Sequence, residues 1–169
     1  PSSSSAASDV YKRQCFDYTP PTVSMTATTS GPMETSCGFI LLNYDSILLL
    51  QYPQGHWSFP KGHVERTDLS RHETAARELK EETGIETVEI DNYWESRTEY
   101  TFRKKGRNTS KQVYWYIART DEVDVKLSHE HTSYLWLNYN DAESMLTFEQ
   151  EKQLLRSAII HMKKSGMIP

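Results

Sequence analysis

The sequence predicts an α/β (α+β) fold in which a β-sheet lies between helical layers. Short runs rich in β-branched and aromatic residues recur along the chain, and two longer segments have the 3.6-residue apolar spacing of helices. Strands interleaved with helices favour a sheet that is covered by helices. The chain has 169 residues and no internal repeat, which suits one domain with a substantial core.

The first two strands are expected at Ser36–Leu42 and Ile47–Tyr52. Asn43–Ser46 lies between them and is made of turn-forming residues, so the two runs are predicted to form a hairpin. Gln54–His63 follows with two glycines and a proline, and this composition indicates a loop.

A helix is predicted from Arg71 to Thr83 by its end signals. Ser70 can accept a hydrogen bond from the first turn, and Glu73 three residues later completes a capping box. Gly84 is a suitable helix stop because glycine adopts the left-handed conformation easily.

The later elements follow from the same patterns. They are strands at Thr87–Tyr93, Ser96–Phe102, Gln112–Ala118 and Tyr134–Leu137, a basic polar turn at Arg103–Lys111, a helical turn at Asp141–Met145, and a helix at Phe148–Lys164.

Composition limits the setting and the partners. Residues 1–34 are rich in Ser, Thr, Pro and Ala and are predicted to be a disordered leader, so the folded domain is expected at 35–166. The balance of 19 basic and 23 acidic residues gives no sign of a general nucleic-acid binder. Two cysteines make no disulfide framework, and the longest apolar runs have four residues. We therefore expect a monomer without membrane or nucleic-acid partners, in the cytoplasm or alternatively the nucleus.

Three carboxylates share one face of the predicted helix. Glu78, Glu81 and Glu82 stand at positions i, i+3 and i+4 and fall within roughly 100° of arc. They repel one another and oppose the helix macrodipole, so a bound cation would stabilise them. Carboxylate oxygens suit Mg²⁺, with Mn²⁺ as the alternative. The other interpretation is a solvated acidic face near a helix end.

The flanking residues make this segment more specific. Trp57–Glu65 stands upstream, and Arg77–Glu78–Leu79 is followed by Glu81–Ile85. Together they resemble the Nudix box, a glycine followed by a glutamate and then by Arg-Glu-aliphatic-x-Glu-Glu-x-Gly-aliphatic. The resemblance implies the Nudix fold, a mixed β-sheet sandwiched between helices (an α/β/α sandwich), and metal-dependent hydrolysis of a pyrophosphate bond.

The spacing departs from the family pattern at one point. In that pattern five residues separate the glycine from a glutamate, and seven residues separate this glutamate from the arginine. Here Asp68 takes the glutamate's place, and eight residues separate it from Arg77. The loop before the helix is therefore one residue longer or lies in another register, and the pattern assigns no role to Asp68.

The resemblance implies a role for each residue of the box. Glu78, Glu81 and Glu82 would bind the divalent metals, with Gly62 letting the backbone approach the site. Arg77 would orient a glutamate, and its i+4 partner is Glu81. The metals would polarise a phosphoryl oxygen and activate a water. One of these glutamates, or one from a later loop, would accept the proton.

Three other segments bear on the substrate. They resemble the asymmetrical diadenosine tetraphosphate hydrolases and comprise His56–Glu65, Gln112–Trp115 and Leu127–Leu137. The resemblance implies Mg²⁺-dependent cleavage of a small-molecule dinucleoside polyphosphate, diadenosine tetraphosphate, into ATP and AMP. It also implies that Glu130 is a further metal ligand or the base, the alternative being a surface residue in a polar turn.

Five residues are implied to bind that substrate. Tyr100 and Tyr134 would sandwich an adenine, His56 and Lys61 would contact the phosphate chain, and Lys111 would grip the distal phosphates. The alternatives are sheet packing for the tyrosines, loop packing for the histidine, and ordinary solvated positions for the two lysines.

Two kinds of rival function remain open. The basic turn would also suit a Nudix enzyme that acts on diphosphoinositol polyphosphates or RNA 5′ ends. A non-catalytic module that senses a nucleotide is the alternative from another class, and the presence of all three helix glutamates of the box disfavours it.

Overall fold

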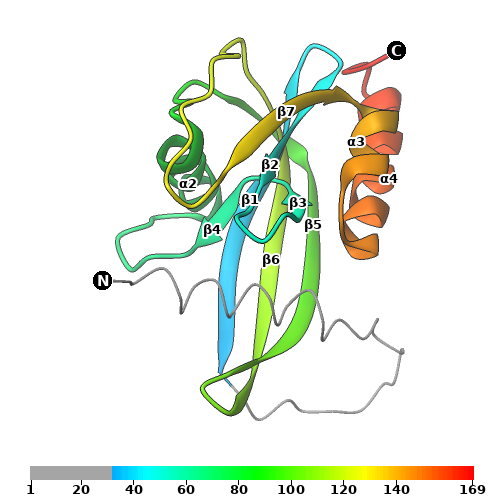
Figure 1. Cartoon of the computed structure of the whole chain (residues 1–169). Helices are drawn as coiled ribbons and strands as arrows, with labels where there is room; N and C mark the ends of the chain where they lie inside the picture. Colours follow the sequence, from blue (N-terminus) through cyan, green and yellow to red (C-terminus); the bar gives the residue numbers. More distant parts are fainter. Residues whose placement is uncertain (1–31) are drawn as a thin grey trace.

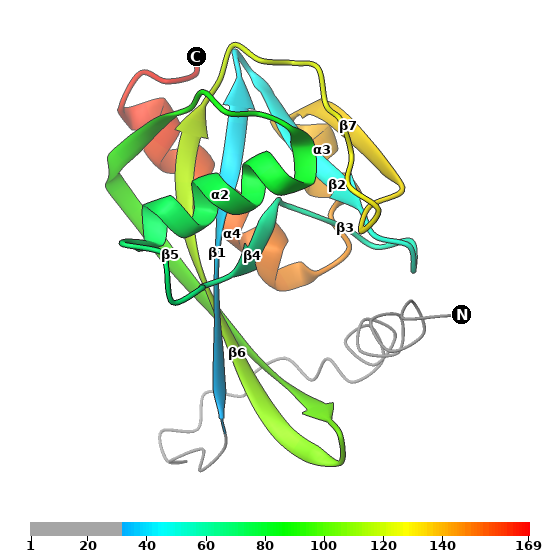
Figure 2. The same cartoon turned by 90° about the vertical axis from the view of Figure 1, so that its left-hand side faces the viewer.

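A central β-sheet separates two helical layers in the computed structural model, which describes residues 32–169. Helix α2 (Arg71–Thr83) covers one face, and helices α3 (Tyr139–Met145) and α4 (Glu149–Lys164) cover the other, as Figures 1 and 2 show. The predicted sandwich is confirmed. Residues 1–31 of the expected leader lie outside the described residues, whereas Met33 and Glu34 already belong to the first strand.

The sheet is mixed and has seven strands among the described residues. Its main order is β3-β2-β1-β6-β5, with β4 paired to β1 and β7 paired to β2. Strands β1 and β6 are parallel, and the other pairs are antiparallel. The bounds are β1 (Met33–Asn43), β2 (Ser46–Gln51), β3 (Trp57–Ser58), β4 (Lys61–His63), β5 (Glu89–Lys104), β6 (Arg107–Arg119) and β7 (Ser133–Asn138).

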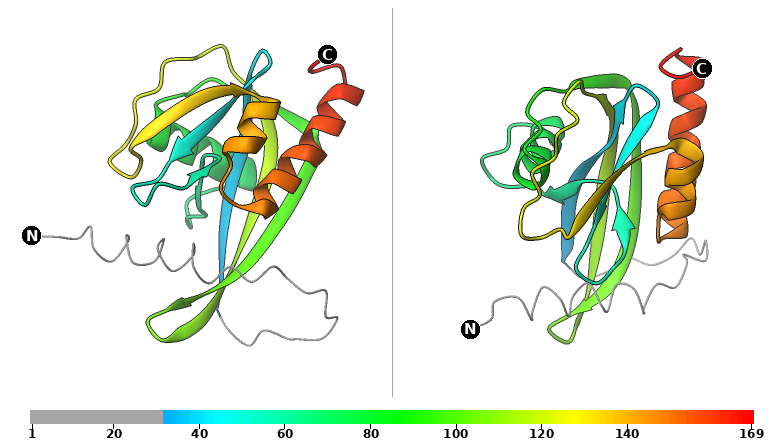
Figure 3. Two further views of the ribbon diagram at one scale, coloured as in Figure 1. Left: turned by 45° about the vertical axis from the view of Figure 1, so that its right-hand side comes forward. Right: turned by 45° about the horizontal axis from the view of Figure 1, so that its top comes forward.

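Helices on both faces explain why the central strands are continuously apolar. Phe39 and Leu41 pack with Leu79 of α2, whereas Ile40 and Leu42 pack with Leu155 of α4. Successive residues of a strand point to opposite faces, so β1 contributes alternately to two separate cores. One core lies under α2 and the other under α3 and α4 (Figure 3).

The β1–β2 hairpin opens soon after its turn. Its register contains only Leu42↔Ile47 and Asn43↔Ser46, and farther along β2 pairs with β3 instead. Strand β7 pairs with β2 over its whole length, from Ser46 to Gln51. The strand β4 takes the place beside β1 that β2 has left. The segment Gln54–His63 was expected to be a loop, but it contains the short strands β3 and β4. Strands of two and three residues are too short to leave a periodic signal in a sequence.

The predicted helix ends are confirmed at α2. The Ser70 side chain accepts a hydrogen bond from the Glu73 backbone at 3.1 Å, and Gly84 has a φ of 76° and closes the helix. The final helix begins at Glu149, with Phe148 as its N-cap residue. Within residues 32–169, no helix is long and apolar enough to cross a membrane.

Strands β5 and β6 form a longer hairpin than the sequence predicted. The two expected strands at Thr87–Tyr93 and Ser96–Phe102 are one strand, with a register irregularity between Ile90 and Glu95. The expected basic turn at Arg103–Lys111 is mostly strand as well, because the turn itself is Lys105–Gly106 with φ values of 49° and 77°. Two residues with positive φ match the twist of antiparallel strands, so pairing continues to the tip.

Gly38 permits the close approach of β4 to β1. A Cβ atom there would lie 2.5 Å from the Pro60 carbonyl oxygen and 2.7 Å from the Trp115 ring. We predict that Gly38→Ala lowers the free energy of unfolding by about 1–3 kcal/mol, because backbone and a buried ring must shift. Urea denaturation measures this.

The matched control is Ser36→Ala, which lies on the same face of β1. The Ser36 hydroxyl is buried without a hydrogen-bond partner among the described residues, so its removal should cost little. Equal stability of the Gly38→Ala variant and the wild type would contradict the packing argument.

Candidate active site

One pocket gathers the carboxylates of α2. It is lined by Glu78, Glu81 and Glu82 together with Tyr52, Lys61, Gly62, His63, Glu65, Lys111, Ser128, His129 and Glu130, and we call it the carboxylate pocket. The structure therefore brings together all the residues expected to bind metal, from α2, β4 and the loop before β7. Lys61 and Lys111 add positive charge to a pocket that is otherwise acidic.

The three helix glutamates differ in their surroundings. Glu82 is only 3 % exposed, and its Oε2 atom has no hydrogen-bond partner among the described residues. Burial raises the pKa of Glu82 well above its ordinary value, with Glu78 and Glu130 adding to the rise and Lys61 opposing it. Glu81 is the exposed member and pairs with Arg77. A buried carboxylate oxygen without a donor is suited to a cation.

Gly62 allows the backbone of β4 to pass close to α2. A Cβ atom at this position would lie 1.9 Å from the carboxyl carbon of Glu78. Every other residue would displace the carboxylate, so the glycine has a steric reason in this fold. Burial also raises the pKa of Glu78, while the neighbouring Arg77 guanidinium opposes that rise.

Arg77 connects the helix to the loop before it. Its Nε and Nη2 atoms donate to the two Asp68 carboxylate oxygens, both at 2.9 Å, and Nη2 also donates to the His63 carbonyl at 2.8 Å. Its Nη1 atom donates to Glu78 at 3.0 Å and to Glu81 at 3.2 Å. The arginine thus contacts Glu81, its expected i+4 partner, and also Glu78, and its own anchor is Asp68.

The contacts of Asp68 show its structural role, which the spacing of the sequence pattern left unassigned. Besides Arg77, its carboxylate accepts hydrogen bonds from the Glu65 backbone at 2.8 Å and from the Thr74 hydroxyl at 2.9 Å. Its side chain is 3 % exposed. These donors hold the pKa of Asp68 well below its ordinary value. The longer loop therefore still delivers a carboxylate to the arginine.

The loop that carries Glu130 is tied to the end of α2. The Lys126 backbone donates to the Thr83 carbonyl at 2.9 Å, and the Ser128 backbone donates to the Glu82 carbonyl at 3.2 Å. These bonds satisfy carbonyls that the last helical turn leaves without internal partners. They also set Glu130, an exposed residue, at the mouth of the carboxylate pocket.

Lys111 is a buried lysine at the base of the long hairpin. It is 5 % exposed, and burial together with the nearby Lys61 lowers its pKa to about 7, while Glu34 opposes this effect. It is buried rather than in the solvated position that the alternative interpretation gave it. An anion bound beside it would favour its charged form.

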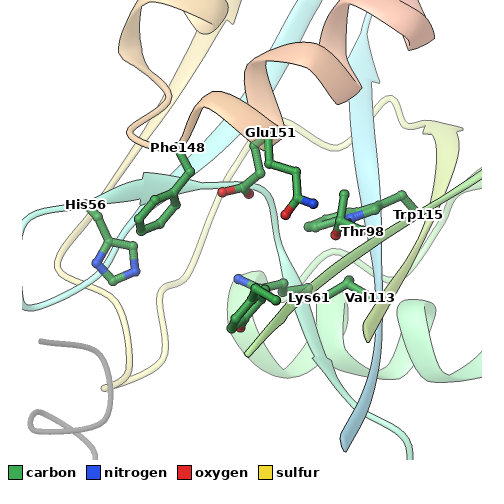
Figure 4. A pocket seen from close by; sticks show the side chains of 9 residues that line it. His56, Lys61, Thr98, Val113, Trp115, Phe148 and Glu151 are labelled. Carbon is green, nitrogen blue, oxygen red and sulfur yellow. Dashed lines mark hydrogen bonds between the residues drawn. The ribbon is translucent and has the colours of Figure 1, made fainter. Parts of the chain in front are cut away.

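A second pocket lies on the α4 face of the sheet. It is lined by His56, Lys61, Thr98, Tyr100, Val113, Trp115, Phe148, Gln150 and Glu151, and we call it the aromatic pocket (Figure 4). Lys61 lines both pockets, so the two pockets meet at this residue. Strand β4 directs residue 61 to the α4 face and residue 62 to the α2 face.

His56 belongs to an aromatic cluster beside Lys61. Its ring stacks on Tyr52 with centroids 4.4 Å apart, and His131 contacts the same tyrosine edge-on at 4.5 Å. The Tyr52 hydroxyl accepts a hydrogen bond from Lys61 at 3.2 Å. Burial and the charge of Lys61 lower the pKa of His56 to about 4 and that of His131 to about 4. Both rings are therefore neutral at pH 7.

The structure does not bring Tyr134 to Tyr100. Tyr134 pairs with Leu50, whose side chain packs under α2, so it belongs to the other face of the sheet. Tyr100 packs against the core under α4 and lines the aromatic pocket. The aromatic residue that shares this pocket with Tyr100, on the side away from the sheet, is Phe148 at the start of α4.

Sequence reasoning missed Phe148, Glu151 and Tyr52 as site residues. Phe148 was assigned to the apolar stripe of the last helix, and Glu151 fell among the polar positions of the same helix. The missing information is tertiary, because only the packing of α4 on the sheet places this helix start over β3 and β4. For Tyr52, the neighbouring His56 and Trp57 were an available signal.

The carboxylates share a pocket without forming a closed cluster. Among residues 32–169, no three His, Cys, Asp or Glu side chains are grouped so that they could hold a metal ion. Arg77 engages Glu78 and Glu81 in this arrangement. The donor set and the unpartnered Oε2 atom of buried Glu82 nevertheless fit a hard divalent cation.

Asp68 makes the stability of the domain depend on pH. A carboxylate whose pKa is lowered by folding stabilises the fold above its unfolded pKa of about 4, and this contribution is lost as the pH falls further. We predict that Asp68→Asn lowers the melting temperature at pH 7 and that its difference from the wild type shrinks below about pH 4.

Thermal melts from pH 7 to pH 2.5 measure the effect. Asp124→Asn, at an exposed position, serves as the matched control and should follow the wild type throughout. A difference between Asp68→Asn and the wild type that is independent of pH would refute the electrostatic explanation.

Comparisons with known proteins agree with the geometry. The rat asymmetrical bis(5′-nucleosyl)-tetraphosphatase is 40 % identical over 116 residues, covering 64 % of this chain and 75 % of that protein. The Caenorhabditis elegans protein of the same name is 34 % identical over 111 residues, covering 64 % and 79 %. The crystal structure of a C. elegans Ap4A hydrolase binary complex is 30 % identical with a TM-score of 0.59, covering 76 % of this chain and 98 % of that one.

The fold is shared more widely than the sequence. The Escherichia coli dihydroneopterin triphosphate pyrophosphohydrolase has a TM-score of 0.60 at 21 % identity, which shows a common fold alone. The NUDIX domain family itself matches residues 33–157, from the start of β1 into α4. A match over this span, with the carboxylates of α2 lining one pocket with Gly62 and Lys61, means that the chain belongs to the Nudix family.

Proposed function

We propose that this Nudix enzyme hydrolyses a pyrophosphate bond in dinucleoside polyphosphates and converts diadenosine tetraphosphate into ATP and AMP. The observation that carries the proposal is the junction of two pockets at Lys61. One pocket offers carboxylates and lysines, which suits a metal-bound phosphate chain. The other offers aromatic rings, which suit a nucleobase. The names of the rat and C. elegans relatives support the same substrate.

The phosphate chain would follow the basic groups between the pockets. Lys61 contributes an ammonium group at the junction, and Lys111 contributes another inside the carboxylate pocket. His56 is neutral at pH 7 and would act as a hydrogen-bond donor to a phosphate oxygen. One adenine would stack between Tyr100 and Phe148, which replaces the pairing of Tyr100 with Tyr134 expected from sequence.

Glu78, Glu81, Glu82 and Glu130 would hold Mg²⁺, or Mn²⁺ in its place, and the Gly62 backbone leaves room for it. When bound, such a metal neutralises phosphate charge and lowers the pKa of a coordinated water. Arg77 would keep Glu78 and Glu81 directed into the pocket, with Asp68 fixing the guanidinium. A bound cation would favour the ionised form of Glu82, whose buried position leaves its charge least screened by solvent.

Side chains of the carboxylate pocket would accept the proton that is released and balance the charge on the phosphate oxygens. Water adds to a phosphorus atom in line with the bond to the leaving nucleotide, that P–O bond breaks, and the water loses a proton. Glu130 lines the pocket from the loop before β7 rather than from α2, and it would accept this proton. The Lys61 and Lys111 ammonium groups would balance charge on the phosphate oxygens.

The substrate assignment predicts an asymmetric product pattern. With Mg²⁺, diadenosine tetraphosphate should yield ATP and AMP in equal amounts with essentially no ADP, which chromatography of the products measures. Two ADP molecules per substrate would contradict the assignment. Preferred turnover of triphosphorylated RNA or diphosphoinositol polyphosphates in the same panel would replace it, and binding without turnover would indicate a sensing module.

The metal assignment predicts a large effect at Glu82. Glu82→Gln should lower kcat by about two to three orders of magnitude or more, because one charged group of the reacting pocket is lost. Its melting temperature should not fall, since the replaced oxygen is unpartnered among the described residues. Glu86→Gln, at an exposed residue just beyond α2, is the matched control and should retain wild-type kcat. Retained activity in the Glu82 variant would exclude the assignment.

The stacking assignment separates Phe148 from Tyr134. Phe148→Ala should raise KM about 10-fold or more with a smaller change in kcat, because stacking on one ring contributes about 1–3 kcal/mol. Phe148→Tyr should keep KM near the wild-type value. Tyr134→Ala should leave KM unchanged, since this side chain belongs to the α2 face. The reverse pattern would restore the pairing of Tyr100 with Tyr134.

The setting expected from composition completes the proposal. Cys37 is a buried free thiol whose pKa burial raises to about 11, and such a cysteine needs no oxidising compartment. The cytoplasm, or alternatively the nucleus, is therefore the proposed location, and a monomer the proposed state.

A further inference from the structure

Glu151 is a buried acidic residue that the proposed hydrolysis does not use. It lies in the first turn of α4, is 8 % exposed, and lines the aromatic pocket with Phe148 and Trp115. Figure 4 shows its carboxylate directed toward the space that these rings enclose. A charge at the bottom of a largely apolar pocket is costly unless hydrogen-bond donors compensate it.

Donors of the chain fix the carboxylate in an accepting role. Lys61 Nζ donates to the Ser58 hydroxyl at 3.4 Å, and the Ser58 hydroxyl in turn donates to Glu151 Oε1. Because the serine oxygen receives the lysine hydrogen, its own hydrogen is directed to the glutamate. The Phe59 backbone amide is a second donor to the same carboxylate.

The pKa of Glu151 is raised overall, because the effect of burial exceeds that of the donors around the carboxyl group. Burial raises the pKa of Glu151, and the Lys61 ammonium, the Ser58 hydroxyl and the Phe59 amide each lower it again. An ionised carboxylate accepts about four hydrogen bonds, of which these described donors account for two. The carboxylate can therefore accept further hydrogen bonds at the wall of the aromatic pocket, whose aromatic side chains suit a nucleobase.

The other walls of the pocket offer no second carboxylate. Gln150 presents a neutral amide oxygen, and its amide nitrogen donates to the Glu99 carbonyl at 3.3 Å. Val113 is apolar, and Trp115 donates its indole N–H to the Thr98 hydroxyl at 2.9 Å. A flat ring between Tyr100 and Phe148 would therefore meet a strong acceptor at one edge only. Among the bases, guanine best matches a carboxylate because its N1–H and its amino group are neighbouring donors.

We propose that Glu151 is a specificity-determining residue that accepts hydrogen bonds from the donor edge of the nucleobase, with Ser58 as its positioning residue. The inference rests on the proposed function in one respect, namely that the aromatic pocket holds a base. It ranks guanine above hypoxanthine, which lacks the amino group, among the bases that this pocket can hold.

The test compares GMP with IMP, which differ only in that amino group. Calorimetric binding in the presence of EDTA excludes any contribution from turnover. The wild type should bind GMP about 10-fold more tightly than IMP, within the range of a paired contact to a base edge. Glu151→Gln keeps the size of the side chain and should reduce this preference several-fold, and Glu151→Met should abolish it. Ser58→Ala should reduce it in part.

A purely structural role predicts a different result. In that case the Glu151 variants would change the melting temperature and leave the ratio of GMP to IMP affinity as it is in the wild type. An unchanged ratio in a folded variant, or no preference in the wild type, overturns the proposal. Ser58→Ala retains the buried carboxylate and decides the matter if both Glu151 variants fail to fold.

The same proteins distinguish this inference from the proposed function. Turnover of diguanosine and diinosine tetraphosphates with Mg²⁺ should show the same preference in kcat/KM. Absence of turnover with an intact GMP preference would contradict the proposed hydrolysis and leave the assignment of Glu151 standing. Turnover of both compounds at equal kcat/KM would support the proposed hydrolysis and contradict the assignment of Glu151.

Discussion

The insertion of β4 beside β1 is the constraint on which the rest of the site depends. The β1–β2 hairpin opens after two paired positions, and β4 occupies the gap with three residues. Two glycines make this possible, because a Cβ at Gly38 would meet backbone and a Cβ at Gly62 would meet the Glu78 carboxylate. The alternation of a strand then sends Lys61 to the α4 face and leaves Gly62 facing α2. One short strand therefore joins the pocket suited to metal and phosphate with the pocket suited to a base.

Buried charges are kept in place by partners from different elements. Asp68 holds Arg77, and Arg77 holds Glu78 and Glu81, so the loop before α2 fixes the geometry of the helix glutamates. Lys61 is near enough to oppose the rise in the pKa of both Glu82 and Glu151, and to lower the pKa of Lys111. Moving the lysine would thus alter the charge of groups on both faces of the sheet. This coupling explains why a single position can serve both pockets.

Local signals predicted the helix and its chemistry, whereas the aromatic pocket depended on tertiary packing. The ends of α2 were predictable because Ser70 and Gly84 act within a turn, and the spacing of Glu78, Glu81 and Glu82 places them together on any helix. Strand β4 was missed because three residues show no period. A tyrosine in a strand does not reveal which helix covers it, so the sequence could not show that Tyr134 lies on the α2 face. Phe148 and Glu151 required the packing of α4 across β3 and β4, which no sequence pattern near them describes.

The carboxylate pocket and the aromatic pocket differ in how they would affect substrate specificity. In the proposed complex, substitutions on the α2 face would alter groups that any pyrophosphate substrate needs, because the carboxylates would act on the phosphate chain that all such substrates share. The start of α4 is different, since Phe148 and Glu151 line the aromatic pocket, which we propose holds the base, the part of the substrate that varies. Glu151 is separated from the helix glutamates by the sheet but is linked to them through Ser58 and Lys61. A change at Glu151 can therefore alter base preference while the hydrolytic pocket keeps its shape, provided that Lys61 retains its position between them.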